Sequence, residues 1–585
     1  MRYRIALALM MSVAVFSMTW ARAATPGAPA ESTGAQEAGP LVVPADNEPG
    51  HSIACWLETS LRRVYPTSPA GTHRELSLVT ARNRHVSFQV CLANRGTSLL
   101  DVGCTVDRAE GCDVRVRRVG YVPQWHATID TSTEELDGVG YVPGLVPDPL
   151  YPESTARVGP GENQSFWITI TVPADAAPGV RDLTVRYAFQ NGAQHAELHA
   201  TLEIHPFVVQ PRHDFPVTHW WRPETIYEHY GIEPFGERWW QLAEAYIRNL
   251  VAHGNNVIFV QQLFPRREVV RRPAQLVKIT CPSPGQYEFD WTHVRRLVRL
   301  SRECGATHFE WSHLWIYWGV RHAMPVYTTE NGQAVLLWPT DTDGHGEVYT
   351  NFLRQFLPSF HQFLQEEKLL DCSFFHLSDE PSAEHIPNYR RARQTLHELA
   401  PWMQVMDALS DVEFGRQKLT DMPIPIVSAA QAYRDEKIPH WVYFCCAPHG
   451  PYLNRFMDTP LAKIRMSGWL FYRLEARGFL HWGYNCWQKL EQDAMLDPFT
   501  EGAAGLWPGI PYGDPFVVYP GPDGPLDSIR WEVFAESLED YALLQTAGVR
   551  PDDPMLGDIR SYADFPKTEA WIAAAMDRVL AGRSP

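Results

Sequence analysis

Two adjacent acids follow a short apolar segment in the second half of the chain. Asp379 and Glu380 come directly after the run 373–377, and Pro381 excludes a continued strand and suits the first turn of a helix. Two carboxyls that flank a glycosidic bond normally come from different strands. A neighbouring pair instead suits substrate assistance, in which the 2-acetamido oxygen of a sugar attacks its own anomeric carbon. Glu380 would protonate the leaving oxygen, and Asp379 would stabilise the oxazolinium.

The same pair has a simpler explanation, because acids are favoured at helix N-termini and could cap a helix that begins near residue 382. Aromatic and polar residues at the ends of other apolar segments favour the catalytic interpretation, since such side chains bind sugars by stacking and hydrogen bonding. The candidate substrate-binding residues are Trp221, Trp315, Tyr443, Arg455, Trp482, Asn485 and Trp487. For each of them, core packing or an ordinary ion pair is the alternative.

A series of apolar segments, with helical patterns between most of them, is expected to position these residues. The expected strands are 215–221, 256–262, 307–316, 373–379, 404–408, 424–428, 441–446 and 478–485. Eight strands in this order predict a (β/α)8 TIM-like barrel over residues 207–548, with the active site at the carboxyl ends of the strands. A doubly wound sheet is the alternative, although no glycine-rich phosphate loop follows any strand.

Residues 51–206 have a different pattern, in which short alternating stretches are separated by turn residues. This pattern predicts an antiparallel β-sandwich, which we expect to be an accessory domain without chemistry of its own. Residues 549–585 are expected to form a C-terminal helical tail. The chain is therefore predicted to be multidomain, as its 585 residues also indicate.

The N-terminal residues 1–23 have the pattern of a signal peptide. Arg2 and Arg4 precede an apolar stretch over 5–20, and the following Ala-Arg-Ala fits a cleavage site. A membrane anchor is the alternative, but the stretch is shorter than the roughly 20 residues of a span. Residues 24–50, rich in Ala, Pro, Gly and Glu, are expected to be a flexible linker. We expect an exported protein, periplasmic or extracellular, without membrane insertion of the mature chain.

The composition narrows the class of partner. The 51 Lys and Arg against 68 Asp and Glu leave a net charge of −17, which argues against nucleic acid. The chain has no CxxC pair and no matched His spacing, so neither a metal nor another cofactor is expected. Its 21 Trp, 23 Tyr and 26 Phe suit an extensive core or a surface that binds sugars. The expected partner is an oligosaccharide or glycoconjugate substrate.

Several segments resemble one known family. The segment 376–381 (HLSDEP) resembles the Asp-Glu-Pro segment of glycoside hydrolase family 123, which overlaps the group called domain of unknown function 4091. Further segments agree, in the same order, over residues 140–545: 141–143 (YVP), 147–150 (PDPL), 454–458 (NRFMD), 478–487 (GFLHWGYNCW), 518–521 (VYPG), 528–532 (SIRWE) and 539–541 (EDY). The resemblance implies a β-sandwich followed by a catalytic barrel. It also implies a retaining exo-β-N-acetylgalactosaminidase with Asp379 as stabiliser and Glu380 as acid/base.

Two other functions remain open from the residues. One is an exo-glycosidase of the same fold that acts on a sugar without the acetamido group. The other is a non-enzymatic carbohydrate-binding protein, in which the acid pair only caps a helix. The intact segment Asp379-Glu380-Pro381 favours an enzyme over a binding protein.

Overall fold

The computed structural model describes residues 39–44, 52–107, 109–189, 194–266, 270, 272–489, 494–503 and 509–582. The expected signal peptide (1–23) lies outside these residues, and so does most of the expected linker (24–50). Within that linker, residues 41–44 form strand β1 (Leu41–Pro44), which pairs antiparallel with β2 (Ser52–Thr59). This part of the linker prediction is wrong, because Leu41 and Val43 pack against the core between the sheets. In the described part of the chain, no helix is both long and apolar enough to cross a bilayer.

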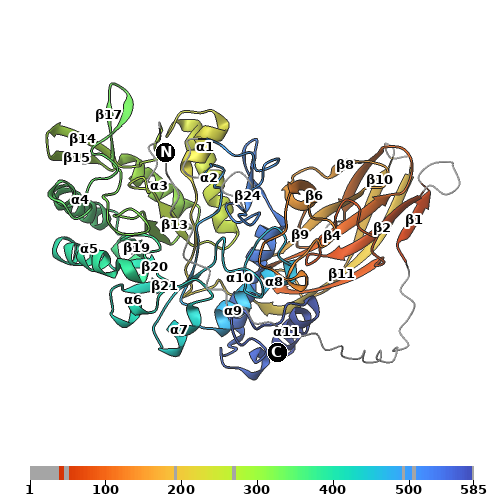
Figure 1. Cartoon of the computed structure of the whole chain (residues 1–585). Helices are drawn as coiled ribbons and strands as arrows, with labels where there is room; N and C mark the ends of the chain where they lie inside the picture. Colours follow the sequence, from red (N-terminus) through yellow and green to blue (C-terminus); the bar gives the residue numbers. More distant parts are fainter. Residues whose placement is uncertain are drawn as a thin grey trace, which may run out of the picture. The chain divides into compact units, whose positions relative to one another are not determined.

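The N-terminal region contains two sheets (Figure 1). The first has the order β1, β2, β4 (Arg84–Asn94), β9 (Asn163–Val172), β6 (Asp113–Gln124) and β7 (Gly144–Tyr151). The second has the order β3 (Glu75–Arg82), β11 (Gln194–Val208), β10 (Gly179–Phe189), β5 (Leu100–Val106) and β8 (Thr155–Val158). All of these pairs are antiparallel except β3 with β11, which is parallel.

The alternation of side chains along the strands explains this packing. In β9, Phe166 and Ile168 belong to the core between the two sheets, whereas Trp167 belongs to the larger core of the following region. Successive residues of a strand point to opposite faces of the sheet. The first sheet is therefore apolar on both faces, since one face packs on the second sheet and the other on the following region.

The region after residue 208 contains short parallel strands. They are β12 (Val217–His219), β13 (Val257–Val260), β16 (His308–Trp311), β19 (Ser373–Phe375), β20 (Met406–Ala408), β21 (Met422–Ile424), β22 (Val442–Tyr443) and β23 (Phe479–His481). Each lies within or next to one of the expected strands. They form three parallel sheets with the orders β12-β23-β22, β13-β16-β19 and β20-β21.

Helices and hairpins lie between these strands and after the last of them (Figure 1). The helices are α1 (Pro223–Tyr230), α2 (Glu237–Ala252), α3 (Thr292–Glu303), α4 (Glu347–Glu366), α5 (Ile386–Leu399), α6 (Glu413–Arg416), α7 (Ala430–Asp435), α8 (Leu461–Arg465), α9 (Ser467–Arg473), α10 (Ile529–Ala547) and α11 (Glu569–Ala581). The hairpins are β14 (Lys278–Ser283) with β15 (Gln286–Asp290), β17 (Tyr327–Glu330) with β18 (Gln333–Leu336), and β24 (Val518–Gly521) with β25 (Gly524–Asp527).

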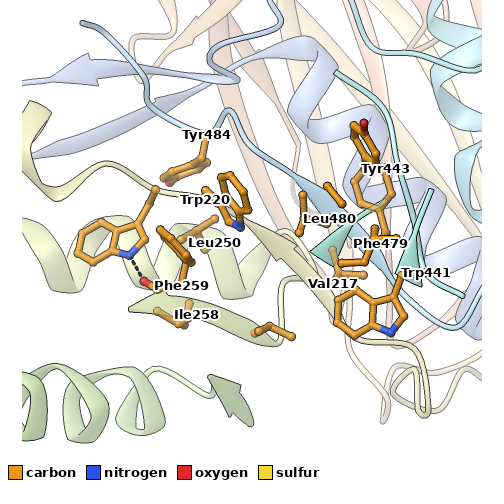
Figure 2. Close-up of a cluster of buried hydrophobic side chains, with 14 of the residues drawn as sticks. Val217, Trp220, Leu250, Ile258, Phe259, Trp441, Tyr443, Phe479, Leu480 and Tyr484 are labelled. Carbon is orange, nitrogen blue, oxygen red and sulfur yellow. Dashed lines mark hydrogen bonds between the residues drawn. The ribbon is translucent and has the colours of Figure 1, made fainter. Parts of the chain in front are cut away.

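The parallel strands pack around a shared apolar core. Figure 2 shows side chains of β12, β13, β22 and β23 gathered in this core, with the Tyr443 hydroxyl directed away from Trp441. The Trp220 and Phe259 rings stack with centroids 5.1 Å apart. Because Trp220 follows β12 and Phe259 lies in β13, this contact packs the two strand ends together. The core thus holds the strand ends in fixed positions, which is what a site built from several strands requires.

A buried ion pair joins the N-terminal sheets to the following region. Asp148 of β7 accepts hydrogen bonds from Arg530 Nε and Nη2 of α10, each at 2.9 Å, and both side chains are fully buried. The Tyr519 hydroxyl donates to the same carboxylate at 2.7 Å. Two segments quoted for the family resemblance, 147–150 and 528–532, therefore contribute to the structure at this junction.

We expect Asp148→Ala to lower the free energy of unfolding by about 3–5 kcal/mol, because it leaves the buried Arg530 guanidinium without a counter-charge. Thermal unfolding followed by circular dichroism measures the loss. The control is Asp101→Ala, which removes an ion pair with Arg157 whose side chains are both more than half exposed, and its effect should lie within the error. Equal unfolding temperatures for the two variants would show that the buried pair does not stabilise the junction.

Candidate active site

The acid pair lies just beyond β19, and two hydrogen bonds attach it to the segment after β16. The Ser378 hydroxyl donates to the carbonyl of Ile316 at 2.9 Å, and the N–H of Trp318 donates to the carbonyl of Asp379 at 2.9 Å. Glu380 is exposed, and its backbone is left-handed, with φ at +46°. This conformation costs about 1–2 kcal/mol for a residue other than glycine. Such strain is concentrated at functional sites.

Neither acid caps the helix that follows. The N-cap of the short 3-10 helix Ala383–His385 is Ser382, whose N–H donates to His385 Nδ1 at 3.1 Å. Helix α5 begins only after that turn. The helix-capping explanation is therefore wrong for both Asp379 and Glu380.

Tyr443 contacts Glu380 directly. It ends β22, and its hydroxyl donates to Glu380 Oε1 at 2.5 Å. Burial of the ring raises the pKa of Tyr443 well above its usual range, so the phenol keeps its proton at neutral pH. From the sequence, Tyr443 is expected to bind substrate. In this structure its hydrogen bond holds the carboxylate of Glu380 in place.

A buried charged network precedes the acid pair. The Nε2 atom of His376 is 2.5 Å from Glu310 Oε1, and its Nδ1 is 3.2 Å from Asp407 Oδ1. Burial lowers the pKa of His376, but the hydrogen bonds to Asp407 and Glu310 outweigh it and raise the pKa to about 10. The imidazole is therefore a cation at neutral pH. Because Asp407 also accepts from the N–H of Leu377 at 3.0 Å, the network ties down the backbone that leads into Asp379.

The pKa of Asp379 is raised well above its usual range. Burial is the main cause, the neighbouring carboxylate of Glu380 adds to it, and the His376 cation opposes both. Two carboxyls this close do not both ionise readily. The free protein therefore holds a proton on the pair, at Asp379, to a higher pH than an isolated aspartate would. The sequence argument gives the role of acid to Glu380, whereas the raised pKa in the structure belongs to Asp379.

Three of the expected stacking residues, Trp221, Trp315 and Trp487, lie in the core. Each is at most 1% exposed, and each donates its Nε1–H to a backbone carbonyl: Trp221 to Phe259 at 2.8 Å, Trp315 to Gly344 at 2.7 Å, and Trp487 to Val518 at 3.1 Å. A ring packed on both faces has no surface for a sugar. Their burial argues against the stacking role expected from the sequence.

The side chains of Asn485 and Arg455 are also buried and contact other residues of the protein. The Asn485 side chain accepts from the N–H of Arg222 at 2.7 Å and donates to the Thr225 hydroxyl at 3.0 Å. Arg455 is 2% exposed, and its Nη1 is 3.1 Å from His219 Nε2. Asn485 therefore joins the segment after β23 to the segment after β12, and Arg455 contacts the end of β12. Both side chains are buried, so neither is exposed to a sugar hydroxyl.

Trp482 remains a candidate for substrate contact. It is partly exposed, and it directs its Nε1–H to Asp514 Oδ2 at 2.9 Å. This bond fixes the orientation of the indole while part of the ring stays accessible. Of the seven expected substrate-binding residues, Trp482 and Tyr443 keep a position consistent with the site.

The structure adds Trp318, which is not among the seven candidate substrate-binding residues. Its side chain is 57% exposed, and its backbone N–H is the group that contacts Asp379. With Tyr317, Arg321 and His385 it lines a cavity of about 300 Å³. The signal available in the sequence was the Tyr-Trp-Gly order at 317–319, where an aromatic pair precedes a turn residue. An exposed indole on the segment that is hydrogen-bonded to Asp379 is a surface on which a sugar ring can stack.

Residues 220–547 match the family model described as glycoside hydrolase 123, catalytic domain. The chain belongs to glycoside hydrolase family 123. The matched residues make up more than half of the chain and include both acids, Tyr443 and Trp318. The match confirms the resemblance noted from the sequence segments and identifies the protein as a glycoside hydrolase.

One solved structure shares the fold of this chain. A family 123 glycoside hydrolase from Clostridium perfringens, described in a study of glycolipid glycan hydrolysis, superposes with a TM-score of 0.69 at 13% identity, over 91% of this chain and 98% of that one. A β-glucuronidase 3 from Bacteroides uniformis reaches 0.28 at 10% identity, over 83% of this chain and 52% of that one. An endo-β-1,4-mannanase from Thermotoga petrophila reaches 0.31 at 11% identity, over 57% and 77%. No curated protein sequence matches this chain.

Proposed function

We propose that this family 123 glycoside hydrolase is an exported, retaining exo-β-N-acetylgalactosaminidase that uses the 2-acetamido group of its substrate as the nucleophile. The observation that carries the proposal is the adjacent pair of acids beyond β19, one with a raised pKa and the other hydrogen-bonded to Tyr443. An adjacent pair cannot easily take both sides of an anomeric carbon. The substrate itself therefore supplies the nucleophile on the second side.

We also propose that the parallel strands close into a (β/α)8 barrel over residues 207–548. A β-sandwich over residues 51–206, to which β1 also belongs, precedes it, and a helical tail at 549–585 follows. Single parallel bridges support the closure, because they join Phe375 to Val405 and Ile426 to Tyr443 and so connect the three parallel sheets. The N–H of Asn256 donates to Val217 O at 3.3 Å, which links β12 to the start of β13. The site then lies at the carboxyl ends of the strands, as in other barrels.

The proposed reaction has two inversions at the anomeric carbon. Binding places the acetamido N–H against Asp379, which favours its ionised form and leaves the shared proton on Glu380. The acetamido oxygen then attacks the anomeric carbon while Glu380 protonates the leaving oxygen. Asp379 stabilises the oxazolinium, and Glu380 next takes a proton from the water that opens it. Tyr443 keeps the Glu380 carboxylate in position through both steps.

A panel of 4-nitrophenyl glycosides tests the proposal. Strong release from the β-N-acetylgalactosaminide is the expected result, and glycolipid and other glycoconjugate glycans with that terminal sugar are the natural substrates to try next. Release only from sugars without the acetamido group would favour another exo-glycosidase on the same fold. Binding without release from any glycoside would favour a carbohydrate-binding protein.

We expect kcat/KM for a substrate with a poor leaving group to fall as the pH rises through the raised pKa of Asp379. The active form of the coupled pair holds one proton, and that proton is lost at this pKa. The basic limb of the plot of kcat/KM against pH should therefore lie well above the range in which ordinary aspartates titrate. A dinitrophenyl glycoside is the control, because its leaving group needs no proton and its basic limb should flatten. If the pH–rate profiles of both substrates had the same basic limb, the pKa of that limb would not be that of the proton donor.

We expect Trp318→Ala to raise KM about three- to tenfold, which corresponds to the ~0.5–1.5 kcal/mol of an aromatic contact. Steady-state kinetics on the best substrate of the panel provide the measurement. Trp318→Phe should retain most of the binding, since it keeps a flat ring. Trp125→Ala, which removes an indole of similar exposure (61%) in the N-terminal region, should leave KM unchanged. An unchanged KM in Trp318→Ala would show that Trp318 does not bind the substrate.

A further inference from the structure

Two adjacent cysteines, Cys445 and Cys446, follow β22 and the residue that contacts Glu380. Both are free thiols with partly exposed side chains, and their Sγ atoms lie 3.7 Å apart. In a regular strand, successive side chains point to opposite faces. The chain bends at both cysteines, so the two thiols share one side. The proposed glycosidase mechanism uses neither of them.

Hydrogen bonds hold the backbone on both sides of this pair. The Cys445 N–H donates to the Ala447 carbonyl at 2.9 Å, and the Asn454 side chain donates to the Cys445 carbonyl at 2.9 Å. His449 Nε2 is 2.6 Å from the Cys446 carbonyl oxygen. Rotation of the two side chains can bring the thiols closer together. Because the backbone is held at these points, the rest of the approach has to displace the adjoining backbone.

We propose that Cys445 and Cys446 form a reversible vicinal disulfide, and that the reduced pair is the active state of the site. The oxidant is a small disulfide, RSSR. The Cys446 thiolate attacks it, which forms a mixed disulfide and releases one RS⁻. The Cys445 sulfur then attacks the Cys446 sulfur and releases the second RS⁻. The protein loses two protons and two electrons, and RSSR gains them as two RSH.

The short chain between the two sulfurs makes such a bond strained and easily reduced. Consecutive Cα atoms are about 3.8 Å apart across a trans peptide, whereas the Cα atoms of ordinary disulfides are about 4.4–6.8 Å apart. Strained disulfides have high reduction potentials and are regulatory more often than structural. The bond should therefore open again with a mild thiol reductant.

The expected effect of this disulfide on catalysis at Glu380 rests on the proposed function. Bond formation has to bring the sulfurs from 3.7 Å to about 2.05 Å, and this contraction begins two residues after Tyr443. The Tyr443 hydroxyl holds Glu380 at 2.5 Å. A misplacement of about 1 Å at a reacting group can cost about 10²-fold in rate. We expect oxidation to lower kcat by about tenfold or more, with recovery after dithiothreitol.

Peptide mass spectrometry of the full chain after treatment with oxidised glutathione tests the bond itself. Trypsin releases residues 438–455 as one peptide, which contains these two cysteines and no others. After alkylation and digestion, this peptide should carry no alkyl group and should be two hydrogen atoms lighter than the reduced form. The exposed Cys281 should carry glutathione, which shows that the reagent reached the protein. An alkylated or only glutathionylated 438–455 peptide would overturn the proposal.

Steady-state kinetics on the same samples test whether the disulfide lowers the activity. Cys446→Ser should retain the activity of the reduced wild type, and glutathione treatment should slow it much less than wild type. If the peptide closes while wild-type kcat is unchanged, the disulfide exists and its effect on the site is refuted. If the reduced protein releases no sugar from any glycoside, the proposed function fails, whereas the peptide mass still decides the disulfide.

Discussion

Replacing Glu380 with glutamine is expected to lower kcat/KM by about 10²–10⁴-fold for substrates with poor leaving groups, and by much less for dinitrophenyl glycosides. A basic leaving oxygen needs a proton in the transition state, and general-acid catalysis is typically worth this factor. Glutamine keeps an oxygen that can accept the Tyr443 hydrogen bond, which is 2.5 Å long in the structure, so the change removes the acid with little effect on its position. A plot of log kcat/KM against the leaving-group pKa measures the difference.

Glu384→Gln is the matched control for this variant. Its side chain is 79% exposed on the short helix that follows the acid pair, and it should change neither kcat nor KM. An equal loss across all leaving groups in Glu380→Gln would assign Glu380 a structural role. Addition of azide to the variant offers a second readout, because this anion attacks the anomeric carbon of the oxazolinium in place of water and needs no general base to do so.

For Asp379→Asn, we expect kcat to fall by about 10²–10³-fold while KM changes little. An ionised Asp379 stabilises the oxazolinium, a charge that develops only in the transition state, and one such group in a water-poor site is worth about 2.7–4 kcal/mol. Loss of an interaction made mainly in the transition state lowers kcat more than it alters KM. Asp371→Asn, an exposed acid before β19, is the control and should behave as wild type.

Two further measurements separate this mechanism from others. A thiazoline analogue of the bicyclic intermediate should bind much more tightly than the product sugar, because it resembles the transition state, and Asp379→Asn should lose most of that preference. Proton NMR of the first product should show a retained anomeric configuration. Inversion, or a trapped glycosyl ester on either acid, is incompatible with the acetamido group as nucleophile.

The positions of the parallel strands could be predicted from the chain because they depend on local pattern. Apolar runs such as 256–262 and 373–379 stand between polar helical segments, and their short length favours a buried strand over a helix. The strands are shorter than these runs, since their ends continue into loops of the site. The expected linker failed at 41–44 because pairing with β2 depends on a partner that local composition does not show.

The aromatic residues show what local pattern could not decide. Trp315 and Trp318 are three residues apart in one segment, yet one is fully buried and the other is 57% exposed. Trp315 is fully buried and donates its indole N–H to the carbonyl of Gly344, 29 residues away in sequence. Local residue type and spacing do not distinguish the two tryptophans, so contacts with distant segments decide which ring is buried.

The amino-acid sequence by itself determined the family and the acid pair, because adjacent Asp379 and Glu380 before a proline are a covalent feature that folding cannot rearrange. Only the tertiary structure decided how the two acids differ. Burial raises the pKa of Asp379, and Tyr443, 63 residues further along the chain, binds Glu380. Both effects depend on desolvation and on contacts between strands that are distant in sequence, and neither leaves a local pattern from which it could be predicted.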